Sequence, residues 1–345
     1  MDKSILRLRK ILNAPQHLPQ GEDLVRLDDV RHASVLVLED PLARGVLKSP
    51  AAAPFDMWGY YLALCRLTAE DAPTLTGFFA NSPMLQHTQS HRETRRNSAW
   101  IYRAIEADLQ VWLGADDAFE GCDASSAQTA YDSAQRFIDR LFVRMVSAAS
   151  GLPEGDIPVL PGHLFDLLPR RKTVLVCEAQ AAALVHALSD HLARTGKSKD
   201  DVWAILVLVI MGYDALRGSV LYALSVGETP TSYSSYDAWF KSIAPVALLP
   251  RRFSRDVEIE GHLFVAGQLA YIFPHLIHRS QVHDDFASSL SFGAGPHTCP
   301  GRRIALLAAS AFFAKLGEIP SDNKPTPNRH WRRDLVLIEK AGKND

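Results

Sequence analysis

The chain has 345 residues, 47% of them hydrophobic and 22% charged, which is the composition of a globular protein and excludes a disordered or fibrous one. Its formal net charge of -2 at pH 7 gives no global attraction to nucleic acid or anionic lipid, so neither is expected as a partner. The four cysteines lie far apart with no CxxC spacing, which argues against a zinc site or a disulfide framework and fits a reducing cytoplasm.

The hydrophobic segments predict no membrane anchor. Residues 1–12 mix basic and apolar side chains, and no apolar stretch of the kind found in signal peptides follows them. The longest apolar run, Val202 to Tyr213, is well short of the roughly 20 residues that a bilayer span needs. We therefore expect this run to form a buried helix and the protein to be cytoplasmic.

The hydrophobic spacing predicts mostly helices, because apolar residues recur every three or four positions over long stretches. Short alternating segments bounded by turn residues predict a few strands. In chain order, the expected elements are strands near 24–27 and 33–38, helices over 41–47, 56–82, 86–113 (one or two), 126–149, 176–195 and 197–225, strands at 257–261 and 263–267 followed by an apolar stretch at 269–273, and a last helix from after Gly301 to about Leu316.

This order predicts a mainly α fold with a small β-sheet near residues 257–267. The helix that starts near residue 197 carries Asp200 and Asp201 in its first turn, where the helix dipole stabilises acidic groups. No internal repeat, low-complexity tract or linker interrupts the chain. A single domain over residues 1–345 is therefore expected.

The segment with the clearest chemical signal is Phe292-Gly-Ala-Gly295-Pro-His-Thr-Cys299-Pro-Gly301. Glycines allow a backbone to pass close to a flat ligand, and a cysteine just before a helix is favoured as a thiolate by the helix N-terminus. A buried structural cysteine on a glycine-rich turn is the alternative. The segment resembles the cysteine loop of cytochromes P450, FxxGxxxCxG, with each fixed position matched.

The resemblance implies a cytochrome P450 fold, truncated relative to the family, and haem b as the cofactor. Cys299 would be the iron ligand, and a thiolate at that position pushes electron density onto the iron. Phe292, Gly295 and Gly301 would shape the loop under the haem. The resemblance extends over roughly residues 25–50 and 80–317.

Several cations occupy positions that resemble the family's propionate-binding sites. His91 and Arg95 match its HxxxR pattern, which places both side chains on one helix face, although a solvated basic face is the alternative. His297 lies two residues before the cysteine, at a frequent propionate-binding position. Arg251 lies where the family usually has a further cation, with Arg252 as the close rival.

The sequence departs from the family at the buried ExxR ion pair. Alignment on Pro245 and Val246 places Ala238 and Lys241 at the two positions, so the acid is missing and the arginine is replaced by lysine. The bracing of the haem-binding core must therefore differ. The connection between the sheet and the cysteine loop is also shorter than the family's usual one.

A second departure concerns the helix that would cover the haem. The family's Ala-Gly-x-Asp/Glu-Thr stretch aligns with Met211-Gly-Tyr-Asp214-Ala215, so the acid remains and the threonine hydroxyl is lost. Asp214 and Ala215 are therefore candidate catalytic positions with altered proton delivery. Arg217 is a candidate anchor for an acidic substrate group, or a surface charge or ion-pair partner of Asp214.

Three functions remain open at this point. The first is an oxidoreductase of the P450 monooxygenase type acting on a small or carrier-bound molecule in biosynthesis, with a ferredoxin-type redox partner. The second is other haem-thiolate chemistry, such as peroxide-driven oxidation, dehydration, nitrogen–nitrogen or carbon–carbon coupling, or nitric-oxide chemistry. The third is a non-catalytic haem-binding protein. The family prior favours the first, and Ala215 motivates the second.

Overall fold

The structure is a computed structural model in which two hydrophobic cores share one cavity between them. It describes residues 24–27, 34–55, 58–82, 96, 99–162, 164, 171–196, 199–226, 230, 235–243, 246, 248–278 and 289–317.

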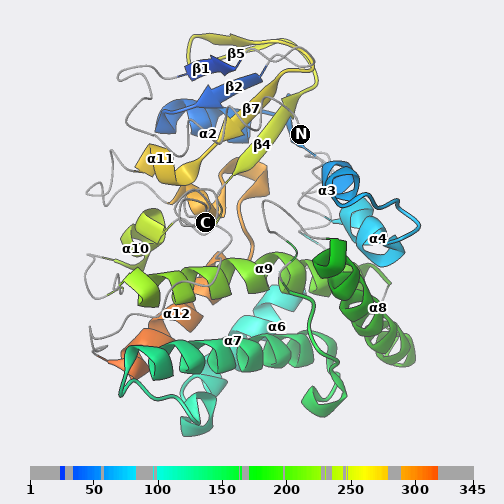
Figure 1. Cartoon of the computed structure of the whole chain (residues 1–345), viewed down its shortest axis with the longest axis vertical. Helices are drawn as coiled ribbons and strands as arrows, with labels where there is room; N and C mark the ends of the chain where they lie inside the picture. Colours follow the sequence, from blue (N-terminus) through cyan, green and yellow to red (C-terminus); the bar gives the residue numbers. More distant parts are fainter. Residues whose placement is uncertain are drawn as a thin grey trace, which may run out of the picture.

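Helices make up most of the described chain; α2 and α11 lie beside the main sheet, whereas the long ones gather at one end of the molecule (Figure 1). They include the long pair α7 and α9, which pack against each other across the middle of the helical core. The helices are α2 (Asp40–Lys48), α3 (Trp58–Cys65), α4 (Pro73–Asn81), α6 (Ala99–Trp112), α7 (Ala127–Ser150), α8 (Arg171–Arg194), α9 (Lys199–Val226), α10 (Tyr236–Ile243), α11 (Pro274–His278) and α12 (Arg302–Leu316), with short 3-10 turns η2 (Asp116–Phe119), η3 (Glu154–Asp156), η5 (Leu290–Phe292) and η6 (Gly295–His297).

The strands form two sheets. The larger sheet has the order β1-β2-β7-β4-β3. It is mixed, because β2 and β7 are parallel while the other neighbouring strands of the sheet are antiparallel. The smaller is the hairpin of β5 and β6. The strands are β1 (Leu24–Leu27), β2 (Ser34–Val37), β3 (Ala52–Pro54), β4 (Leu249–Phe253), β5 (Val257–Ile259), β6 (His262–Phe264) and β7 (Leu269–Ile272).

The expected mainly α fold is confirmed, and so is the small sheet near residues 257–267, whereas a second, larger sheet was not predicted. The segment 257–267 forms only the separate hairpin, and the five-stranded sheet joins the N-terminal strands to β4 and β7. Neither β3 nor β4 was expected. Partners from opposite ends of the chain build this sheet, and local alternation carries no information about such pairing.

Helix ends follow local rules. Ser126 caps α7 by accepting the Thr129 N–H at 3.1 Å, and the Thr129 hydroxyl oxygen accepts the Ser126 N–H at 2.9 Å, which is a reciprocal capping arrangement. Gly151, with a φ of 81°, ends the same helix in the left-handed conformation that glycine adopts without strain.

The cysteine loop lies where the two cores meet. Phe292 belongs to the helical core, together with the buried faces of α6, α7, α9 and α12. Ala294, two residues later, belongs to the sheet core, together with α2 and the main sheet. The loop therefore contacts both cores in the few residues before Cys299.

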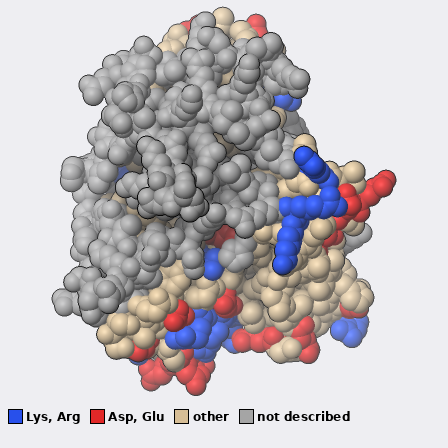
Figure 2. All heavy atoms as spheres, in the orientation of Figure 1, with Lys and Arg blue, Asp and Glu red and all other residues tan. Residues whose placement is uncertain are grey.

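The described surface carries both signs of charge. Lys or Arg and Asp or Glu side chains lie together over the helical end of the molecule (Figure 2). There Arg144 on α7 contacts Asp108 on α6 at 2.7 Å and Glu154 at 2.9 Å, and hydrogen bonds to these two carboxylates raise its pKa. These charges stabilise contacts between elements, and the view has no large patch of one sign among the residues it colours.

Among the described helices, only α9 has the length and apolar composition that a membrane span would need. However, 72% of its most apolar stretch is buried inside the protein. Such burial is typical of a core helix in a globular protein. The sequence predicted a buried helix for the run from Val202 to Tyr213.

Candidate functional site

A cavity of about 260 Å³ lies between the two cores and collects most of the predicted site residues. Its walls come from α9, the cysteine loop, the start of α12, β4 and the aromatic residues of α3, α4, α6 and α7. Most lining side chains are apolar, which excludes much of the water from the cavity. The polar side chains at the walls belong to Arg251, Asp214, Ser291, His297 and Cys299, with two tyrosines, Tyr61 and Tyr102.

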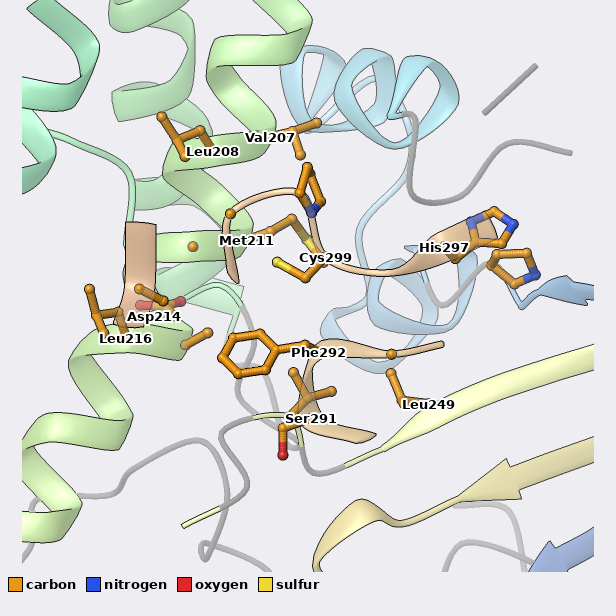
Figure 3. A pocket seen from close by; sticks show the side chains of 18 of the residues that line it. Val207, Leu208, Met211, Asp214, Leu216, Leu249, Ser291, Phe292, His297 and Cys299 are labelled. Carbon is orange, nitrogen blue, oxygen red and sulfur yellow. The ribbon is translucent and has the colours of Figure 1, made fainter. Parts of the chain in front are cut away.

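Cys299 reaches this cavity from a loop that is closed by backbone hydrogen bonds. Its own N–H donates to the Phe292 carbonyl at 2.7 Å, and the Thr298 N–H donates to the Gly295 carbonyl at 3.2 Å. The side chain is directed into the cavity (Figure 3). Gly301 follows at the N-cap of α12, so the thiol lies at the N-terminal end of that helix.

Two glycines give the loop its path. Gly293 has a φ of 70°, and a Cβ there would lie 3.0 Å from the His297 carbonyl oxygen. Gly295 has a φ of 67°, and a Cβ there would lie 2.9 Å from the Cα of Lys48 at the end of α2. Both positions therefore require glycine. Gly293 lines the cavity, whereas Gly295 fixes the loop against α2.

The alternation of β4 distinguishes the two candidate arginines. Arg251 is buried and lines the cavity, whereas Arg252 points outward and lies over the Phe55 ring at 4.9 Å. One guanidinium N–H of Arg251 donates to the Pro250 carbonyl at 2.8 Å, but its buried Nε has no hydrogen-bond partner. Burial without a described carboxylate beside it lowers the pKa of Arg251 to about 10.

His297 is also buried, on the η6 turn, and lines the same cavity. Cys299, Arg251 and His297 are thus brought together by one loop and one strand. His91 and Arg95 lie outside the described residues.

The α9 wall carries the other predicted residues. Asp214 is buried, and its Oδ2 accepts the Leu164 N–H at 2.9 Å. The next residue, Ala215, also lines the cavity. It presents a methyl group at the position that the sequence alignment matched to a threonine. Arg217 is not among the lining residues, and its Nε donates to the Gln135 side chain on α7 at 2.5 Å. The structure thus brings Asp214 and Ala215 to the cavity and directs Arg217 toward α7.

The bracing of the loop by α10 is aromatic. Phe240 packs on Phe292 with ring centroids 5.0 Å apart, and Trp239 packs edge-on against Phe313 of α12 at 5.3 Å. The Ser291 hydroxyl donates to the Phe240 carbonyl at 3.4 Å. Lys241, at the position of the family's arginine, is only 2% exposed. Contacts between rings thus join α10, the loop and α12 next to Ala238 and Lys241, the positions where the sequence departs from the ExxR ion pair.

Sequence reasoning missed several lining residues. Phe79 on α4 lines the cavity, whereas the neighbouring Phe78 is part of the packed core. Tyr213 on α9 donates a hydrogen bond to Asp139 on α7. The residues Tyr61, Tyr102, Phe142, Met145 and Met211 line the cavity and were not predicted. The sequence signal that could have placed Met211 at the cavity is its position four residues before Ala215, because residues four apart lie on the same face of a helix.

Comparison with known proteins gives a fold but no close relative. No protein-family model matches the chain, and no curated protein matches its sequence. Solved structures match it over nearly its whole length at low identity. P450BioI in complex with acyl carrier protein ligated to hexadec-9Z-enoic acid is 15% identical, covering 90% of this chain and 92% of that chain, with a TM-score of 0.59.

Two further structures give the same result. HmtT, involved in himastatin biosynthesis, is 15% identical, covering 92% of this chain and 94% of that chain, with a TM-score of 0.59. Epothilone B-bound cytochrome P450epoK is 16% identical, covering 95% and 93%, with a TM-score of 0.58. The expected fold is confirmed: this chain has the fold of these cytochromes P450.

Proposed function

We propose that this chain, with its cytochrome P450 fold, is a haem-thiolate oxidoreductase of the monooxygenase type. The observation that carries the proposal is the Cys299 side chain, held by a closed loop at the wall of an apolar cavity. Cys299 would bind the iron of haem b, with the glycines of the loop allowing the close approach.

The residues at the cavity fit a haem. A macrocycle needs an apolar slot, a thiolate and cations for its propionates, and the cavity has the Cys299 loop between apolar walls. Arg251 has a buried Nε with no hydrogen-bond partner, and burial lowers its pKa. A bound carboxylate would accept a hydrogen bond from this Nε and pair with the buried positive charge. His297 would join Arg251 on the propionates, as would His91 and Arg95.

When bound, thiolate-ligated haem supplies oxygen or peroxide activation. The chain's own residues set the conditions for it. The aromatic and aliphatic walls exclude water and hold a carbon-rich substrate. Asp214 presents the acid of the α9 wall and can hold or pass a proton at its carboxylate, while Ala215 cannot, because it has no hydroxyl.

The proposed substrate is a small or carrier-bound molecule of a biosynthetic pathway. The apolar lining favours a hydrocarbon portion, and the solved complex of P450BioI with an acyl carrier protein supports delivery by a carrier. Electrons would come from a ferredoxin-type partner. The exposed Arg303, which pairs with Glu106 at 2.7 Å, lies just past the cysteine loop where such a partner would dock.

A second candidate is haem-thiolate chemistry outside ordinary monooxygenation, with peroxide as the oxidant. Ala215 at the cavity wall favours it, because a hydroxyl that would help deliver protons to bound oxygen is missing there. In this case electrons from a ferredoxin would not be required.

Turnover assays separate the two candidates. Haem-loaded protein is given long-chain acyl substrates, free and bound to acyl carrier protein, with either ferredoxin, its reductase and NADPH or hydrogen peroxide alone. We expect substrate-dependent consumption of NADPH and an oxygenated product, both lost in Cys299→Ala. Product with peroxide alone would favour the second candidate, and stable haem with no product under either condition would contradict both.

A further inference from the structure

On the α9 wall of the cavity, one side chain, that of Met211, contains a sulfur atom, whereas its neighbours on the same helix face are hydrocarbon. Val207, Met211 and Ala215 follow one another at four-residue spacing, so they share one face of the helix, and all three line the cavity. Only Met211 has an atom with lone pairs that a metal could accept. Figure 3 shows its side chain and that of Cys299 directed into the cavity from two different elements.

The packing of α9 holds this face toward the cavity. A Cβ on Gly212 would lie 3.3 Å from the Phe142 ring on α7, so the two helices are in close contact there. A Cβ on Gly162 would lie 3.0 Å from the Tyr213 ring on another side of α9. With its neighbours held in this way, α9 cannot rotate Met211 out of the cavity without separating these contacts.

The carboxylate on the same helix is already engaged. Asp214 is 8% exposed, and its Oδ2 accepts the Leu164 N–H at 2.9 Å, so its side chain is held toward the segment that crosses α9. Met211 carries no comparable restraint and has three rotatable bonds. Of the donor atoms on this wall, the thioether sulfur is therefore the one that can move to meet a metal.

We propose that Met211 provides its sulfur as the second axial ligand of the haem iron, opposite Cys299, when no substrate is bound. This inference rests on the proposed function, because it requires haem on Cys299. Thioether sulfur is an ordinary axial ligand of haem iron. The bond is a lone-pair donation without electron transfer, and the flexible side chain can withdraw when substrate or another ligand arrives.

Selenium labelling tests the bond directly. The chain has five methionines, and replacing them with selenomethionine places a strong X-ray scatterer at each. In the ferric haem-loaded protein we expect iron X-ray absorption to record selenium at bonding distance. Met211→Leu abolishes that signal. Met145→Leu, which changes the other described methionine of the cavity wall, keeps it. Both substitutions nearly conserve volume, so the fold is retained.

Ligand titration gives an independent readout. An imidazole that binds ferric iron must first displace Met211, so its affinity is reduced by the fraction of protein in which the sulfur is bound. If that fraction is about nine-tenths, Met211→Leu binds imidazole about tenfold more tightly than the unaltered protein. Met145→Leu is expected to bind it like the unaltered protein.

The carbon monoxide spectrum of the ferrous protein separates the possible failures. A thiolate-type spectrum with no iron–selenium signal, and equal imidazole affinity in Met211→Leu, would overturn the role of Met211 and leave the proposed function intact. Protein that takes up no haem would overturn both.

Discussion

At the scale of single residues, the site combines two glycines that no other residue can replace with a buried, unsatisfied cation. Gly293 and Gly295 both have positive φ angles, and a side chain at either would meet backbone atoms. Arg251 is buried at the wall of the cavity with its Nε unsatisfied. The glycine at position 295 should support both stability and haem binding, whereas the buried cation should lower the stability of the haem-free protein and support haem binding.

The first prediction concerns Gly295. In Gly295→Ala, the added methyl group meets the α2 backbone at Lys48, besides the strain of a left-handed alanine. Gly267, with a φ of 83° and open space around it, is the matched control, because only strain of roughly 1–2 kcal/mol applies there. Gly295→Ala is expected to lose about 1–3 kcal/mol more than Gly267→Ala in urea unfolding, because of overpacking.

Haem retention completes this comparison. Gly295→Ala should release haem faster than Gly267→Ala, because the displaced loop carries Cys299. Equal losses of stability and equal haem retention in the two variants would show that the contact with α2 does not matter.

The second prediction concerns Arg251. Its pKa is lowered by burial, so the charged side chain destabilises the folded haem-free protein at every pH below about 10, and the cost falls as the pH rises above that value. Arg251→Met is expected to raise the free energy of unfolding of the haem-free protein by about 1–3 kcal/mol near neutral pH, since a hydrophobic residue replaces a buried charge.

Haem binding should respond in the opposite direction. Arg251→Met is expected to weaken it, because a propionate loses its cation, whereas Arg252→Met should leave both properties nearly unchanged, because Arg252 is exposed. Urea unfolding and haem transfer to an acceptor protein measure the two effects. A less stable haem-free Arg251→Met protein with unaltered haem binding would contradict the assignment.

At this scale, the sequence predicted several of the residues that line the cavity. Fixed spacing in the cysteine loop indicated Cys299 and His297, and alignment indicated Arg251, which the structure brings to one cavity. The choice between Arg251 and Arg252 depended on the register of β4, a strand that the sequence did not reveal. Met211 was missed as a lining residue, although it lies four residues before Ala215 and so shares its helix face.

At the scale of elements, the contact of α10 with the cysteine loop is the main departure from expectation. The family's ion pair is replaced in sequence by Ala238 and Lys241, and the structure places aromatic rings between α10, the loop and α12. Loss of the ion pair could be predicted from sequence. Its aromatic replacement could not, since Trp239, Phe240, Phe292 and Phe313 look like ordinary core residues in isolation.

The third prediction tests this bracing. Phe240 is 1% exposed and packs on Phe292, so Phe240→Ala is expected to cost about 3–5 kcal/mol of unfolding free energy and to weaken haem retention. Phe264→Ala is the control, because Phe264 is equally buried but stacks on Phe253 in the sheet core at 4.5 Å. It should cost a similar free energy of unfolding.

Haem retention, measured at a temperature where both variants are folded, separates them. Only Phe240→Ala should lose haem faster than the unaltered protein. If Phe264→Ala released haem equally fast, the effect would be one of general stability, and α10 would have no particular role in holding the loop.

At the scale of the whole molecule, two cores meet at one cavity, and the cysteine loop passes between them. The helical share was predictable, because α7 has helical periodicity, α9 contains a long apolar run, and turn residues such as Gly151 and Gly196 mark helix ends. The five-stranded sheet was not, because it pairs β2 with β7, more than two hundred residues later, and β3 with the distant strand β4. Fold similarity at 12–16% identity supports the architecture and leaves the chemistry to the site.

The central claim is that the thiolate of Cys299 binds the haem iron. The most direct test is the difference spectrum of the purified, haem-reconstituted ferrous protein with and without carbon monoxide. The account predicts a Soret band at the position characteristic of thiolate-ligated haem, absent in Cys299→Ala. A band of the kind given by thiol or histidine ligation, or protein that takes up no haem, would contradict it.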